Sequence, residues 1–195
     1  MVLVIDTSSS RSAIALVDGE GRALADDVAV GGREHDLPGR VLTLVEPRRL
    51  TAVAVAVGPG SFTGLRVGVS YGVGLAMGLD VPLLALGSLD VQAARARVPA
   101  TPLVEAGRGR LYWRAAADEE PRLGEPAELP DGLPVVGWLR EETAGAVRAA
   151  GARSLGDDEL HGFAQAAALA LGDAERVSYD TVRLRYMQSF RPSLA

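Results

Sequence analysis

The segment spanning residues 53–68, VAVAVGPGSFTGLRVG, constrains the fold more than any other part of the chain. Its apolar, β-branched start predicts a buried strand over residues 53–57. A Gly-Pro-Gly turn follows, and Ser61 then occupies the position of a helix N-cap. A strand, a glycine turn and a helix start bring the backbone close to a neighbour. That neighbour is either an anion held by N–H groups or another chain.

Composition excludes several kinds of site. The 195 residues suffice for one domain or two small lobes, and none of them is Cys. Disulfides, thiolate metal sites and a Cys nucleophile are therefore excluded. All 20 basic residues are Arg, so a Walker A lysine and a Schiff-base lysine are excluded as well.

Charge and hydropathy indicate a cytoplasmic protein. The net charge of −5 disfavours nucleic-acid binding by the chain alone. The start, MVLVIDTSSS, lacks the basic region and cleavage site of a signal peptide. The longest apolar stretch, residues 67–79, is too short to span a bilayer. We therefore expect no membrane association.

Hydrophobic periodicity and turn residues predict an α/β chain of two lobes, with domains at residues 1–99 and 100–195. The expected strands are 2–5, 12–17, 23–30, 53–57, 81–86, 103–106, 110–116 and 135–138. The expected helices are 35–45, 63–77, 89–96, 143–150 and 158–171. The turn DGEG at 18–21 predicts a hairpin, 118–134 a loop, and 182–190 a strand or an extended tail.

The glycine turn does not match a known nucleotide fingerprint. Gly58, Gly60 and Gly64 are spaced as GxGxxxG, one residue away from the dinucleotide-binding pattern. That fold also needs a βαβ unit where this chain opens with a hairpin. Ser61 lacks the surroundings of a nucleophile elbow.

A second candidate is the turn Asp6-Thr7-Ser8, which follows the first strand. An acid and hydroxyls at a strand end can hold a phosphate or a magnesium ion. These side chains can instead form hydrogen bonds with the backbone of their own turn, and the pattern alone favours this second interpretation. His35 has Gly39, which is not a ligand, four residues on; His161 has Asp157 and Asp158 close by, but it lies in what reads as the solvated first turn of a helix. We therefore expect no metal site.

Small residues recur every four positions on the long helix, at Gly64, Gly68, Gly72 and Ala76. Each glycine destabilises a helix interior by about 1 kcal/mol relative to alanine. A close backbone approach along this stripe would offset that loss. The approaching element is either a neighbour in the same lobe or a helix of another chain, and the sequence leaves both open.

Several segments together resemble the TsaB (YeaZ) family. They are IDTSSSRSAIAL at the start, REH at 33–35, GPGSFTGLRVGVSYGVGLAMG at 58–78 and LYW at 111–113. The match runs in order to about Arg114, and VRLRY at 182–186 is similar to the family's closing YLR. The resemblance implies the two-lobe fold of the actin, Hsp70 and sugar-kinase superfamily, which is ribonuclease H-like, with mixed sheets flanked by helices; in this chain we expect the second lobe to be small.

The same resemblance implies a function. The family takes part in making N6-threonylcarbamoyladenosine at position 37 of tRNAs that read ANN codons. Its members are non-catalytic partners of the paralogue TsaD, which carries the metal and the transferase activity, and the ATPase TsaE joins them. We therefore expect a heterodimer with TsaD, a homodimer when the chain is alone, only indirect contact with tRNA, and no cofactor outside the complex.

The resemblance also assigns residues. It places partner contacts at His35 and, on the helix after GPGSFTG, at Gly64, Arg66, Gly68, Gly72 and Ala76. It marks vestigial phosphate loops at Asp6, Thr7, Ser8, Gly58, Gly60, Ser61 and Glu105. The catalytic paralogue holds its metal through a His-x3-His pair, which Gly39 breaks here.

This chain departs from the family pattern at three places. The segment between His35 and Thr51 is short, EAGR at 105–108 has Gly107 where the family has Arg, and the second lobe is small. The alternative function is an ATP-hydrolysing or kinase-like enzyme that uses Asp6 and the 58–64 turn for phosphates. A weaker alternative is a metallopeptidase-like activity. The partner hypothesis is favoured, because Glu105 begins at best a remnant of a second phosphate loop.

Overall fold

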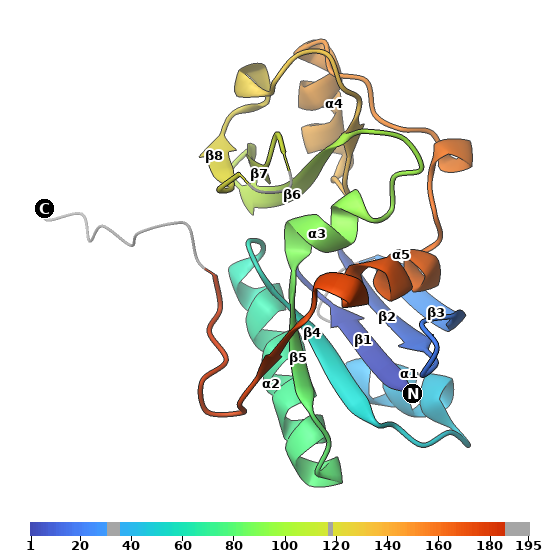
Figure 1. The fold of residues 1–195 in the computed structure, drawn as a ribbon. Helices are drawn as coiled ribbons and strands as arrows, with labels where there is room; N and C mark the ends of the chain where they lie inside the picture. Colours follow the sequence, from blue (N-terminus) through green and yellow to red (C-terminus); the bar gives the residue numbers. More distant parts are fainter. Residues whose placement is uncertain (31–35, 117–118, 186–195) are drawn as a thin grey trace, which may run out of the picture.

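Two β-sheets of different size divide the chain into two lobes (Figure 1). The computed structural model describes residues 1–30, 36–116 and 119–185. Within them the larger sheet has the strand order β10-β5-β4-β1-β2-β3, and the smaller sheet has the order β8-β7-β6-β9. The predicted α/β class with a smaller second lobe is confirmed.

The elements have the following bounds. The larger sheet contains β1 (Val2–Asp6), β2 (Arg11–Val17), β3 (Ala23–Val30), β4 (Ala52–Gly58), β5 (Leu83–Gly87) and β10 (Glu175–Val177). The smaller sheet contains β6 (Thr101–Gly107), β7 (Arg110–Trp113), β8 (Arg122–Gly124) and β9 (Val135–Val136). The α-helices are α1 (Leu37–Val45), α2 (Phe62–Leu79), α3 (Ser88–Ala93), α4 (Glu141–Ala149) and α5 (Phe163–Ala170). The 3₁₀ turns are η1 (Pro126–Glu128), η2 (Asp157–Glu159) and η3 (Leu171–Asp173).

The larger sheet begins with the antiparallel hairpin that the sequence predicted. β2 pairs antiparallel with both β1 and β3, and the Asp18 carbonyl accepts the Gly21 N–H in the connecting turn. β4 lies parallel to β1 on one side and to β5 on the other. Every residue of β4 is buried, in agreement with its unbroken apolar run.

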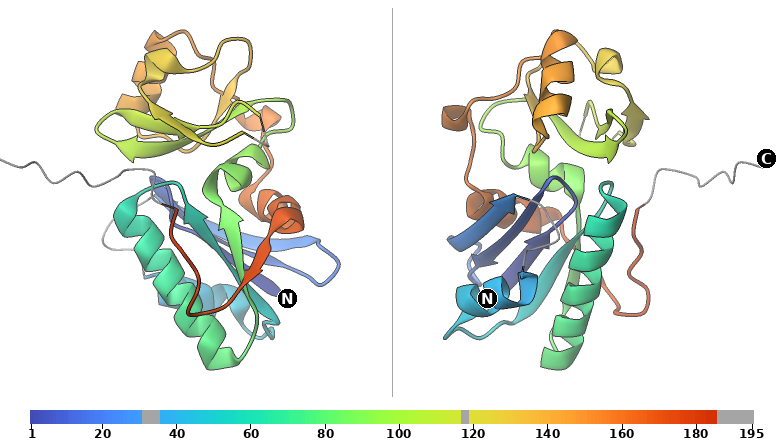
Figure 2. Two further views of the ribbon diagram at one scale, coloured as in Figure 1. Left: turned by 60° about the vertical axis from the view of Figure 1, so that its left-hand side comes forward. Right: turned by 180° about the vertical axis from the view of Figure 1, so that it is seen from behind.

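Helices cover both faces of the larger sheet (Figure 2). On one face, α1 and α2 pack against side chains such as Leu3 and Ile5 of β1. On the other face, α3 and α5 pack against Val4 of the same strand. Adjacent residues of β1 therefore pack into two separate cores, because successive side chains of a strand point to opposite faces of the sheet. No described helix has the length and apolar character needed to cross a membrane.

Arg40 fastens α1 to the edge of the larger sheet. Its Nε lies 2.8 Å from Oδ2 of Asp27 on β3. Its two terminal nitrogens donate to the hydroxyl and the carbonyl of Ser12 on β2, at 3.0 and 2.9 Å. A planar guanidinium can satisfy several acceptors at once, so this one residue fixes α1 against two strands.

The second lobe differs from its prediction in three ways. The chain returns to the first lobe, because α5 packs on the larger sheet and β10 pairs with β5. Residues 163–177 therefore do not belong to the predicted domain 100–195. The predicted loop at 118–134 contains β8 and η1, and the helix expected at 158–171 is split into η2 and α5.

Side chains from both lobes meet where the sheets approach each other. Trp138, which follows β9, is buried in the core formed on the α5 face of the larger sheet. Its carbonyl accepts a hydrogen bond from the Ser10 hydroxyl at 3.2 Å. Arg114 of the second lobe forms an ion pair with Asp90 of α3. These contacts hold the two lobes in one arrangement.

Candidate functional site

The glycine turn after β4 packs against the turn between β1 and β2. The Ser8 carbonyl accepts the Ser61 N–H at 2.7 Å. A Cβ on Gly60 would overlap that carbonyl, so only glycine fits there. The Ser61 hydroxyl accepts the Gly64 N–H at 3.3 Å, and the predicted N-cap is thereby confirmed. The turn thus brings together Ser8, Gly60 and Ser61, three of the residues assigned to phosphate loops.

The last residues of the described chain cover the same turn from outside. We call residues 178–185 the C-terminal strap. The N–H of Arg185 donates to the Val57 carbonyl at 2.8 Å, and a Cβ on Gly58 would lie 2.7 Å from the Arg185 carbonyl. Val182 and Leu184 pack against the core beneath. The glycine turn therefore contacts two segments of its own chain.

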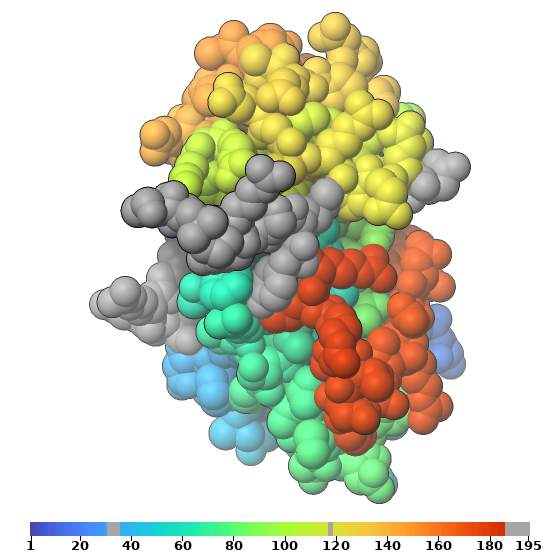
Figure 3. Space-filling view, turned by 90° about the vertical axis from the view of Figure 1, so that its left-hand side faces the viewer, coloured from blue at the N-terminus to red at the C-terminus, as the bar shows by residue number. Residues whose placement is uncertain are grey.

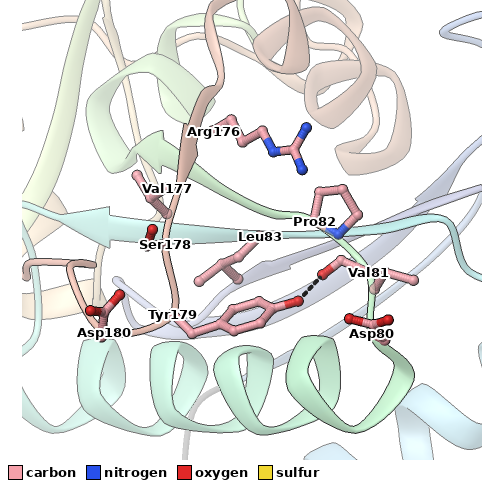
Figure 4. Close-up of a pocket in the computed structure, with 9 residues that line it drawn as sticks. All are labelled: Asp80, Val81, Pro82, Leu83, Arg176, Val177, Ser178, Tyr179 and Asp180. Atoms are coloured by element: carbon pink, nitrogen blue, oxygen red, sulfur yellow. Dashed lines mark hydrogen bonds between the residues drawn. The ribbon is translucent and has the colours of Figure 1, made fainter.

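The strap is anchored at its other end by Tyr179, whose hydroxyl donates to the Val81 carbonyl at 2.6 Å (Figure 4). Figure 4 shows the Tyr179 ring lying below Leu83 and above α2. The pocket beside it has a volume of about 550 Å³ and lies at the end of α2 that is remote from the glycine turn. It is therefore separate from the predicted phosphate loops.

The small residues of α2 face inward, which makes the prediction of a partner interface at these residues wrong. A Cβ on Gly64 would overlap the Thr7 carbonyl, and one on Gly68 would overlap the Thr7 hydroxyl. A Cβ on Gly72 would overlap the Val55 side chain. Ala76 is fully buried. Of the two alternatives that the sequence left open, the structure supports the approach within the same lobe.

The physical reason is the closeness of α2 to the sheet at its first turns. The Thr7 hydroxyl donates to the Gly64 carbonyl at 2.7 Å, and this contact fixes the start of the helix over the end of β1. Side chains larger than hydrogen would push the helix off the sheet. Glycines at this spacing fit any close backbone neighbour, so their pattern does not say which neighbour it is.

The opposite face of α2 carries the exposed apolar side chains that sequence reasoning missed. Phe62, Val67 and Met77 are about half exposed, and the guanidinium of Arg66 lies 3.8 Å from the centroid of the Phe62 ring. Arg66 is therefore the one assigned contact residue on α2 that lies on the solvent side. The signal was present in the sequence as apolar residues outside the glycine stripe.

A groove runs between α2 and α1, beside this exposed face. Figure 3 views the molecule from the side on which α2, α1 and the C-terminal strap lie next to one another. The groove has a volume of about 560 Å³. Its lining is mostly apolar: Pro38, Val41, Leu42, Val45, Pro47, Arg48, Arg49, Leu50, Tyr71, Leu75 and Leu79. Leu42 at its margin is exposed. His35, which was also assigned to the interface, lies outside the described residues.

Asp6 is fully buried at the end of β1. Its Oδ1 accepts the Ser8 N–H at 2.9 Å, which is the turn contact expected if the segment satisfies its own backbone. Its Oδ2 has no hydrogen-bond partner among the described residues. Burial raises the pKa of Asp6, while Ser8 and the charge of Arg95 act in the opposite direction.

Glu105 is not brought into contact with the Asp6 turn. Its Oε1 accepts the N–H of Arg140, which belongs to the second lobe, at 2.9 Å. The β6–β7 turn that follows has Gly107, Arg108 and Gly109 at positive φ. The assignment of Glu105 to a vestigial phosphate loop therefore stays a prediction, and the contact that the structure gives it is with Arg140 of the second lobe.

One cavity lies beside the glycine turn, between the lobes, with a volume of about 430 Å³. It is lined by Gly58, Pro59, Gly87, Leu89, Asp90, Arg114, Glu120, Pro121 and Arg185. Asp90 and Arg114 pair with each other across it. Among the described residues, no three His, Asp or Glu side chains gather in a way that could hold a metal ion. His161 lies before α5 and uses its backbone N–H to bond the Arg95 carbonyl.

Residues 43–127 match the family model described as TsaD: tRNA N6-adenosine threonylcarbamoyltransferase. The chain is 34% identical over 123 residues to the tRNA threonylcarbamoyladenosine biosynthesis protein TsaB of Bacillus subtilis (strain 168), covering 57% of this chain and 52% of that protein. It is 33% identical over 129 residues to the TsaB protein of Escherichia coli (strain K12), covering 57% of this chain and 53% of that protein. The matches thus span about half the length of these curated relatives.

The solved structure of YeaZ from Pseudomonas aeruginosa superimposes with a TM-score of 0.73 at 24% identity, covering 95% of this chain and 99% of that one. This likeness shows a shared fold with YeaZ and, with the match to the TsaD model, supports the predicted actin-like, ribonuclease H-like fold. The relatives named TsaB, the match to the paralogous TsaD model and this fold agree with the resemblance of the GPGSFTG segment. Together these comparisons support assigning the chain to the TsaB (YeaZ) family.

Proposed function

We propose that this chain is a non-catalytic partner of TsaD in the threonylcarbamoylation of adenosine 37 in tRNAs that read ANN codons. The names of its TsaB relatives, which refer to threonylcarbamoyladenosine biosynthesis, support the pathway. The observation that carries the partner role is the exposed apolar face of α2 next to the groove on α1. Contiguous apolar surface of this kind is typical of a protein interface.

The partner surface in this proposal is the outward side of α2, with Phe62, Arg66, Val67 and Met77, and the groove margin at Leu42. The buried glycines serve the interface indirectly, because they set how closely α2 lies on the sheet. The aromatic ring and the arginine are residue types enriched at interface centres. TsaE joins the heterodimer, the chain pairs with itself when alone, and tRNA contact is indirect.

The non-catalytic part of the proposal is supported by the state of the phosphate loops. The glycine turn packs against Ser8 and the C-terminal strap, and the Ser61 N–H at the start of α2 already bonds the Ser8 carbonyl, although a cavity of about 430 Å³ lies beside the turn. Glu105 bonds within the second lobe instead of meeting Asp6. A phosphoryl-transfer enzyme requires groups positioned around the phosphate, and these two features oppose such an arrangement. In the proposal the chain works in the cytoplasm, and a nucleotide binds only in the complex.

The decisive variant is Val67→Glu, tested with TsaD from the same organism by calorimetry. Val67 is 50% exposed on α2, so a charge there leaves the fold intact but becomes buried when a partner binds. We expect the affinity to fall by at least about tenfold, which corresponds to about 1.4 kcal/mol.

Leu169→Glu on α5 is the matched control, because Leu169 is 51% exposed on the other face of the sheet. It should bind TsaD like the wild type. Equal weakening by both variants, or by neither, would contradict the proposed surface. A sizing column with the same two variants tests the homodimer, which should dissociate only in Val67→Glu.

A further inference from the structure

A nearly buried arginine without an ion pair lies where the two lobes meet. Arg95, just after α3, is only 8% exposed. Its guanidinium donates to the side chain of Gln92 at 2.9 Å. Among the described residues it forms no ion pair with a carboxylate. Buried arginines are almost always paired, because an uncompensated charge away from water is strongly unfavourable.

A second arginine shares the aromatic ring against which Arg95 lies. The Arg95 guanidinium is 4.3 Å from the centroid of the buried Trp138 ring, and that of Arg11 is 5.8 Å from the same centroid. The ring attracts both cations, but the cations repel each other. Burial and the charge of Arg11 lower the pKa of Arg95 to about 10, while Asp6 and Asp157 act in the opposite direction.

These side chains line a cavity of about 320 Å³, which we call the junction pocket. Arg11, Arg95, Trp138 and His161 are among the residues of its wall. Two carboxylates also border it. Asp26 already accepts the Ala164 N–H at the start of α5, at 2.7 Å, and Asp157 is exposed. Arg95 and Trp138 are thus the buried part of the lining, and both acids of the lining lie on exposed residues; the buried Asp6 also acts on Arg95 but does not line the pocket.

We propose that the junction pocket binds a small oxyanion, a phosphate or carboxylate group, between Arg95 and Arg11. Such an anion would accept charge-assisted hydrogen bonds from Arg95 and remove the repulsion between the two guanidinium groups. It would contact both lobes at once, because Trp138 comes from the second lobe and Arg11 from the first. The site is distinct from the Asp6 turn and does not depend on the proposed partnership with TsaD.

Tryptophan fluorescence of the isolated full chain tests the proposal. The chain has two Trp residues, so Trp113→Phe leaves Trp138 as the sole reporter. Inorganic phosphate, titrated against chloride at equal ionic strength, should give a saturable change and raise the melting temperature. Acetate in a parallel titration distinguishes a carboxylate site from a phosphate site.

Three further variants in the same background locate the site. Arg95→Gln should weaken phosphate binding by at least about tenfold, and Arg11→Gln should weaken it by a smaller factor. Arg148→Gln, at an exposed ion pair on α4, is the control and should bind like the parent. If Arg95→Gln does not fold, the phosphate affinity of Arg11→Gln decides whether the pocket binds the anion, because Arg11 is exposed and its substitution leaves the core unchanged.

Two results would overturn the inference: a chloride response equal to that of phosphate, or phosphate affinity unchanged in the arginine variants. A merely structural Arg95 would alter stability without any dependence on phosphate. Because these measurements use the chain without TsaD, their failure leaves the proposed function untouched, and failure of TsaD binding leaves the junction pocket untouched.

Discussion

Gly64→Ala should destabilise the fold, because α2 lies directly on the end of β1. The added Cβ would overlap the Thr7 backbone carbonyl, which cannot rotate away as a side chain would. Overpacking of this kind costs about 1–3 kcal/mol. Displacing the helix would also strain the 2.7 Å hydrogen bond from the Thr7 hydroxyl to the Gly64 carbonyl, worth about 0.5–1.5 kcal/mol.

Helix propensity acts in the opposite direction, since alanine is favoured over glycine by about 1 kcal/mol in a helix interior. The net loss is therefore about 0.5–3.5 kcal/mol by these figures. For a chain of this size, each kcal/mol lowers the melting temperature by about 2–4 °C. Circular dichroism followed through thermal and urea unfolding measures both quantities.

Gly74→Ala on the same helix is the matched control. A Cβ there meets no atom within 4 Å, so only the propensity term remains. This variant should be more stable than the wild type by about 0.5–1 kcal/mol. If Gly64→Ala were as stable as Gly74→Ala, α2 would not lie as close to β1 as described, and the inward orientation of the glycines would be refuted.

Three further predictions concern the ionisation of Asp6, the contacts of Arg40 and the hydrolysis of ATP. Burial raises the pKa of Asp6, so its ionisation destabilises the fold as the pH rises above about 4. Asp6→Asn should therefore have a higher free energy of unfolding than the wild type at pH 7. Urea titrations should show this difference disappear below about pH 4. Arg40→Met leaves Asp27 and Ser12 without their donor and should lower stability by about 1–3 kcal/mol in the same assay. The isolated chain should release phosphate from ATP at the background rate; turnover near 1 s⁻¹ that Asp6→Ala abolishes would favour the kinase-like alternative.

Local signals in the sequence predicted the elements around the glycine turn. The DGEG turn, the alternation of β3 and the unbroken apolar run of β4 each have a short-range physical cause. The Ser61 cap is local as well, because its acceptor and donor lie three residues apart. These elements therefore agree with the structure to within a residue or two.

The parts that could not be predicted depend on contacts between distant segments. β10 has only three residues and no period of its own, and it forms because β5 offers an unpaired edge. The inward direction of the glycine stripe depends on Thr7, which follows β1, and on Val55 of β4. The unpaired burial of Arg95 arises only when Trp138 packs across from the second lobe. No pattern within one segment encodes such meetings.

Apart from Arg66, the partner contacts on α2 were predicted on the side that packs against the sheet, whereas the surface we propose lies on the solvent side of that helix. The resemblance assigned contact residues by position, and the most recognisable positions on α2 are its glycines. On this helix, glycine occupies the positions where a Cβ would overlap the strands and turn beneath it, which are on the side against the sheet. The exposed apolar residues between them carry the surface that we propose for the partner.

The most direct test of the proposed function is the reconstituted reaction with TsaD, TsaE, tRNA and the carbamoyl-adenylate donor, with threonylcarbamoyladenosine measured by mass spectrometry. Product should form only when this chain is present, and the yield should stop rising at one chain per TsaD. Val67→Glu should support little product and Leu169→Glu a normal amount. Product formed by TsaD and TsaE without this chain, or by this chain without TsaD, would contradict the account of a required, non-catalytic partner.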